Sequence, residues 1–146
     1  MTVKVTGLSR LTARVKAARQ IITEDVRKAT EEAAYIIMEE SEANAPVLTG
    51  RLEASHEVVE DTTGYGNPVY VVRFEAINPE DGFDYGAVMH ESVYDLGPES
   101  EKKQQANGHI VGRKFLERAV EEKYDECVDL VRSVAKRGFR KALKNV

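Results

Sequence analysis

The sequence has too few cysteines and apolar runs for several common classes of protein. Its single cysteine, Cys127, excludes a disulfide within the chain and a metal site built from several cysteines. No apolar run approaches the roughly 18 residues of a membrane-spanning helix. Residues 1–7 also lack the apolar stretch of a signal peptide. We therefore expect an intracellular protein without membrane segments, and the length favours a single domain over residues 1–146.

Motifs that carry catalysis or bind cofactors are missing as well. The three histidines, His56, His90 and His109, lie far apart in the sequence, and none forms a pair at helical spacing. The sequence therefore predicts no metal site, and without a glycine-rich dinucleotide fingerprint or phosphate loop it predicts no cofactor. His90 and Glu91 beside Tyr85 have the composition of an acid–base group. Nothing nearby supplies a nucleophile, so we expect a structural hydrogen bond there and no enzymatic activity.

Two long segments carry apolar residues at steps of three and four, the period of an amphipathic helix. The first helix is predicted over about residues 9–44 and the second over about 114–143. At 1.5 Å per residue the first would be roughly 50 Å long, more than a small domain needs. It either breaks near residues 23–25 or projects and packs against other chains.

The chain between these helices shows the shorter period of strands. Apolar and polar residues alternate on both sides of a turn at residues 62–68, which predicts an antiparallel hairpin over about 52–76. Residues 84–91 are predicted as a short helical turn in preference to a third strand. Residues 92–112 lack any period and are predicted as a long polar loop. The fold class is therefore α+β, with helices covering one face of a small antiparallel sheet.

A hinge is expected between the first helix and the hairpin. Pro46 removes a backbone donor and restricts the residue before it, so the helix should end there. Thr49 and Gly50 then form a turn in which glycine tolerates a positive φ, and Leu52 starts the next element. This hinge is predicted to be structural and to take no part in chemistry.

Charge is unevenly distributed along the chain. The net charge is −4, but residues 1–30 carry +5 and residues 131–146 carry +6, which leaves −15 for residues 31–130. Such asymmetry suggests nucleic acid, or an acidic surface on another copy, as a partner; the alternative is that these are solvated helix ends. The candidate contact residues are Arg10, Arg14, Lys16, Arg19, Lys136, Arg137, Arg140, Lys141 and Lys144.

Three short blocks resemble a family of tailed bacteriophages, the head–tail joining proteins, also called tail-completion, neck or minor tail-connector proteins. The first block is Ala45-Pro46-x-x-Thr49-Gly50-x-Leu52-x-x-Ser55, after a long helix. The second runs from Tyr85 to His90-Glu91, and the third is Arg113-Lys114-Phe115-Leu116-x-x-Ala119. Lys114 departs from the family pattern, which usually has proline there, and the loop at 92–112 is longer than is usual.

The resemblance implies a non-enzymatic structural protein of the virion. Members form rings, commonly hexameric, in the neck between the head-side connector and the tail-side terminator, and DNA passes through the lumen. It implies location in the virion neck or tail, with host cytoplasm during assembly. Opposite charges would let copies align around a ring. The competing interpretation is a non-specific DNA-binding module that uses the basic helix segments without sequence-specific readout.

Overall fold

The computed structural model describes residues 8–61 and 69–144. The α+β class is confirmed, with mostly helical structure and one two-stranded sheet. The elements in chain order are α1 (Leu8–Asn44), α2 (Arg51–Ala54), β1 (Glu57–Asp61), β2 (Val69–Arg73), α3 (Tyr85–Glu91), α4 (Pro98–Asn107) and α5 (Phe115–Lys144). The two long helices therefore lie within two residues of their predicted bounds, and α3 is the short helix that was preferred to a strand.

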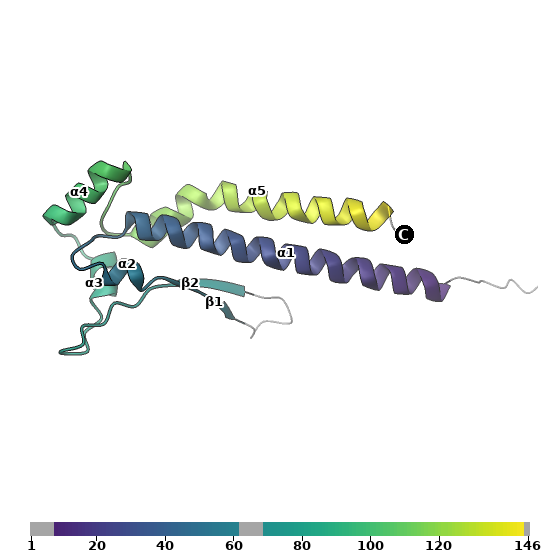
Figure 1. Cartoon of the computed structure of the whole chain (residues 1–146), viewed down its shortest axis with the longest axis horizontal. Coiled ribbons are helices and arrows are strands. Elements are labelled where there is room, and N and C mark those ends of the chain that lie inside the picture. The colour runs from purple at the N-terminus through teal and green to yellow at the C-terminus, as the bar shows by residue number, and fades with distance from the viewer. Residues whose placement is uncertain (1–7, 62–68, 145–146) are drawn as a thin grey trace, which may run out of the picture.

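Helices α1 and α5 run antiparallel side by side and form an elongated helix pair (Figure 1). Helix α1 is unbroken through residues 23–25, so the alternative of a break there is wrong. Packing of α1 against other chains stays a prediction. Gly138 of α5 permits close packing, because a Cβ built there would lie 3.3 Å from Cγ1 of Ile22. The absence of a side chain at Gly138 thus sets the spacing between α1 and α5 near the C-terminus of α5.

The sheet packs along α1 on the side opposite α5 (Figure 1). Its strands pair antiparallel, from Glu57 with Arg73 to Asp61 with Val69. Nη1 of Arg27 on α1 donates a 2.8 Å hydrogen bond to the Tyr70 hydroxyl on β2. Of the two long helices, α1 is the one that packs against both strands, so a single helix covers the sheet where we had expected both.

The predicted first strand begins too early. Residues 51–54 form the helical turn α2, and β1 starts at Glu57, so the hairpin does not extend over the whole of 52–76. Leu52 and His56 are buried while Ala54 is exposed. Residues four apart share one face of a helix, and they also share one face of a strand. In so short a segment the burial of Leu52 and His56 therefore fits either structure. The predicted turn at residues 62–68 lies outside the described residues.

The predicted loop at 92–112 is wrong in its centre, where α4 occupies Pro98–Asn107. This helix has no apolar stripe, so periodicity misses it. Its boundaries nevertheless carry standard signals, with Pro98 in the first turn and Gly108 in the left-handed conformation (φ 72°) after the last.

The core lies where the end of α1, α2, α3, α4 and the start of α5 meet, and we call this region the junction. Ala45, Leu52, Ala76 and Phe115 form its buried apolar cluster. The buried residues of α1 are Ala29, Ala33 and Ala34 and, nearer its C-terminus, the polar Glu40, Ser41 and Asn44, whereas Tyr35 is 44% exposed. Polar side chains therefore make up the buried surface of α1 at its C-terminal end.

Candidate functional site

The hinge residues lie at the junction and line a pocket of about 190 Å³. Gly50 has φ 76°, as expected for a glycine that turns the chain from α1 into α2. Pro46 is buried, Thr49 is exposed, and Leu52 belongs to the core cluster. Tyr85 of α3 lines the same pocket, so the first two motif blocks meet here.

The third motif block packs into the same core. The fully buried Phe115 ring lies 4.8 Å from the His90 ring, edge to face, and 4.7 Å from the Phe74 ring. Leu116 and Tyr85 pack against this cluster. The family-motif residues that are far apart in the sequence therefore form one packed unit.

His90 is a part of this packing. Its Nδ1 lies 2.8 Å from Oε1 of Glu91, the structural hydrogen bond expected from the sequence. Its Nε2 is buried and has no hydrogen-bond partner among the described residues. The His90 ring contacts the rings of Phe74 and Phe115, at centroid distances of 5.4 and 4.8 Å.

Lys103 of α4 holds the junction together, and sequence reasoning missed it. Its ammonium group donates to the backbone oxygens of Glu42 and Ala45 and to the carboxylate of Glu53. The last carbonyls of any α-helix lack partners within the helix, so this side chain caps α1 from outside. Lys103 lies in the segment 92–112 that was predicted as a loop, so nothing in the sequence pattern marked it as a capping residue.

A second cation reaches the same helix end from α5. Nη2 of Arg118 donates to the Ile110 oxygen at 2.6 Å and to the Asn44 oxygen at 3.4 Å. The backbone nitrogen of Gly112 also donates to the Asn44 oxygen, at 3.0 Å. Burial lowers the pKa of Arg118 from its ordinary value.

Lys114 explains why this chain departs from the family's proline. Its φ is 57°, the only positive value at a non-glycine residue in the described chain. Its backbone nitrogen donates a 2.7 Å hydrogen bond to the His90 oxygen. Proline has a fixed negative φ and no N–H, so it cannot occupy this position in the observed geometry.

His56 is a buried histidine of the core, and it precedes β1 instead of lying in a strand as the predicted hairpin over 52–76 placed it. Its Nδ1 lies 3.0 Å from the Leu52 carbonyl, which can only accept, so Nδ1 carries the proton. Nε2 then accepts from the Ser41 hydroxyl at 2.9 Å. Burial lowers the pKa of His56 below its ordinary value, because desolvation disfavours the charged ring.

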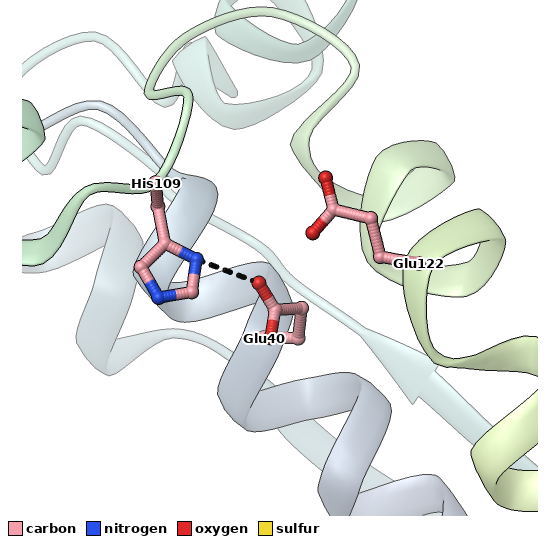
Figure 2. Close-up of side chains that lie close together, drawn as sticks. All are labelled: Glu40, His109 and Glu122. Atoms are coloured by element: carbon pink, nitrogen blue, oxygen red, sulfur yellow. Dashed lines mark ion pairs between the residues drawn. The ribbon is translucent and has the colours of Figure 1, made fainter.

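A cluster of ligand-type side chains lies beside the junction, where the sequence predicted no metal site. Glu40 of α1, His109 of the α4–α5 loop and Glu122 of α5 converge (Figure 2). His109 Nδ1 is 2.7 Å from Glu40 Oε1, and Lys123 Nζ is 3.4 Å from Glu40 Oε2. Burial raises the pKa of Glu40, but His109 and Lys123 outweigh that effect, so its pKa lies below the ordinary value.

The predicted electrostatic residues gather at the other end of the molecule. Because α1 and α5 are antiparallel, residues 8–23 and 131–144 lie at the same end of the molecule, where the first turns of α1 extend beyond the end of α5 (Figure 1). These two segments contain ten Lys and Arg residues and no Asp or Glu. We call them the basic end. The candidates Arg10, Arg14, Lys136, Arg137, Arg140 and Lys141 all belong to it.

The helix pair also exposes apolar side chains at the basic end. Val15, Ile22, Phe139 and Leu143 line a groove between α1 and α5. Phe139 is 59% exposed. A second groove, nearer the middle of the pair, includes Tyr124, which is 61% exposed. Aromatic residues exposed along a groove are typical of surfaces that bind other proteins.

Residues 9–77 match the HK97-gp10-like family. The family is described as "Bacteriophage HK97-gp10, putative tail-component". The resemblance to a phage family is thereby confirmed at the level of similarity to a bacteriophage tail-component family.

The HK97-gp10-like segment covers α1, the hinge and both strands. It includes the first motif block and ends before the second and third, which pack against it in the core. No curated protein and no solved structure matches the chain. Among the described helices, none is long and apolar enough to cross a membrane.

Proposed function

We propose that the protein is a non-enzymatic ring component of the neck of a tailed bacteriophage. In this role it joins the head-side connector to the tail-side terminator, and DNA passes through the lumen. The family match of residues 9–77 supports this proposal most directly. The ring, commonly hexameric in the family that the motifs resemble, assembles from copies of this chain.

The charges of α5 suggest how copies contact one another. Its first half, residues 115–130, has six acidic and two basic residues, whereas residues 131–144 have six basic and none acidic. The exposed carboxylates include Glu121, Asp125 and Asp129, which are four residues apart and share a helix face. The basic end of one copy therefore has a complementary surface on the next, and the adjacent apolar groove adds contact area.

Native mass spectrometry and electron microscopy test the assembly. We expect a ring, formed by the protein alone or with the connector encoded by its own phage. The charge-reversed variant Arg137→Glu/Arg140→Glu/Lys141→Glu should lose the ring, and adding Glu121→Lys/Asp125→Lys/Asp129→Lys to the same chain should restore it. A protein that stays monomeric and binds neither neck neighbour would contradict the proposed function.

Non-specific binding of DNA is the second candidate function, because the fold unites two basic segments at one end of the molecule. Fluorescence anisotropy with duplexes of unrelated sequence, over a salt series, tests it. We expect equal affinities for all sequences and a steep loss with salt, with the logarithmic slope reduced by about 0.9 for each phosphate contact removed. Dissociation constants weaker than millimolar at low salt would exclude this function.

A further inference from the structure

Three side chains with metal-ligand chemistry reach one point from three separate segments. Glu40 comes from α1, His109 from the α4–α5 loop and Glu122 from α5 (Figure 2). One ligand atom of each lies within 4.8 Å of those of the other two. Ligands about 2.1 Å from a tetrahedral zinc ion lie about 3.4 Å from one another. Reaching coordination distances therefore requires the 2.7 Å pair between His109 Nδ1 and Glu40 Oε1 to open and the exposed Glu122 side chain to rotate.

Asn44 supplies an independent observation at the same place. It lies one helical turn after Glu40 and is only 1% exposed, and its Nδ2 points to Oε1 of Glu40 at 3.5 Å. Its Oδ1 is buried without a hydrogen-bond partner among the described residues. Turning the amide over places Oδ1 beside the carboxylate, an arrangement that two acceptors tolerate when a cation lies between them.

We propose that Glu40, His109 and Glu122 bind a divalent transition-metal ion of the zinc type, with Asn44 as a fourth ligand. Two carboxylates and a neutral imidazole carry a charge of −2, which a divalent cation neutralises. Carboxylate oxygens together with an imidazole nitrogen suit zinc and its neighbours better than magnesium, which prefers oxygen ligands alone.

Lys123 competes with the metal for Glu40. Its ammonium group lies 3.4 Å from Oε2 of Glu40 and 3.4 Å from Oε2 of Glu126, so it occupies part of the anionic site. Metal binding moves Lys123 toward Glu126, on the exposed surface of α5. Removal of Lys123 should therefore strengthen metal binding. If Lys123 only formed a structural ion pair with Glu40, its removal would not have this effect.

The ion would fasten the junction to the helix pair. Glu40 lies near the end of α1, Glu122 in the second turn of α5, and His109 in the loop that joins α4 to α5. A metal bound by all three fixes these segments relative to one another, because binding to the folded state alone stabilises it. The proposal is independent of ring formation and of DNA binding.

Isothermal titration of the metal-stripped full-length protein with ZnCl2 tests the site. We expect one zinc ion per chain and a higher melting temperature in its presence, with no comparable effect of MgCl2. His109→Ala and Glu122→Gln should each weaken zinc binding by at least about tenfold. Lys123→Gln should tighten it.

The matched control is Glu121→Gln, which removes a neighbouring exposed carboxylate outside the cluster and should leave the affinity unchanged. Circular dichroism without metal shows whether each variant is folded. Glu122→Gln keeps the pair between His109 and Glu40, so it remains informative if His109→Ala unfolds. Absence of zinc binding, or binding equally strong in Glu122→Gln and wild type, would overturn the proposal.

Discussion

The junction and the basic end of the helix pair are built on different principles. The junction is tied by hydrogen bonds between distant segments, and its centre is a fully buried aromatic ring, that of Phe115. At the basic end only α1 and α5 pack together, and residues such as Val15 and Phe139 are more than half exposed. The junction is therefore held by contacts among several segments of one chain, whereas the basic end leaves large apolar side chains exposed.

The largest difference is expected between two phenylalanines of α5. Phe115→Ala leaves a cavity among Phe74, His56 and His90 and should cost about 3–5 kcal/mol of unfolding free energy. Phe139→Ala should change it by less than about 0.5 kcal/mol, because Phe139 is largely exposed. Urea denaturation of both variants measures the comparison. Equal losses would show that the basic end is as tightly packed as the junction.

The next effect concerns two adjacent lysines of α4. Lys103→Met removes the cap of α1 and leaves Glu53 and two carbonyls without this donor, so we expect a loss of about 2 kcal/mol. Lys102→Met breaks only an exposed pair with Glu99 and should cost less than about 0.5 kcal/mol. Thermal melts of the two variants measure this difference. Similar melting temperatures would contradict the role of Lys103 as a cap of α1.

Gly50 tests the hinge. Gly50→Val forces a β-branched residue into φ 76° and should destabilise the protein by about 1–3 kcal/mol. Gly97→Val is the matched control, since Gly97 has an extended backbone and open space around its Cβ position. An unchanged melting temperature for Gly50→Val would mean that the positive φ is not required.

The smallest expected effect is a pH dependence from His56. The unfolded chain binds a proton near the ordinary pKa of 6.5, whereas the folded protein has a lowered pKa and resists protonation. Stability from this residue is therefore fully present above pH 6.5 and falls as the pH decreases below it. Denaturation of wild type and His56→Gln between pH 7 and 5 should show a steeper loss for wild type. Parallel curves would contradict the assignment.

The elements that have a strong local sequence signal were predicted from the sequence. Both long helices, the short α3 and the positive φ of Gly50 were predictable because each has a strong local signal. Helix α4 was missed because it is polar on all sides, although Pro98 and Gly108 mark its ends. Leu52 and His56 were assigned to a strand because a single helical turn is too short to separate the two periods.

Long-range contacts at the candidate sites could not be read from local patterns. Nothing near Lys103 in the sequence indicates that its partners lie about 50 to 60 residues earlier, around the end of α1. The metal cluster was overlooked because the search was for histidine pairs, and His109 meets carboxylates from two other segments. The basic segments were identified, but their meeting depends on the antiparallel packing of α1 and α5.

That packing brings the N-terminus of α1 and the C-terminus of α5 to the same end of the molecule, and both carry basic residues. The peptide dipoles of a helix sum to a partial positive charge at its N-terminus and a partial negative charge at its C-terminus. Lys141 and Lys144 in the last turn of α5 are therefore favourable to their helix. The first turn of α1 has no acidic residue, and Arg10 in this turn destabilises α1 by about 0.3–1 kcal/mol. An anionic surface brought to this end would relieve that repulsion and stabilise α1 itself.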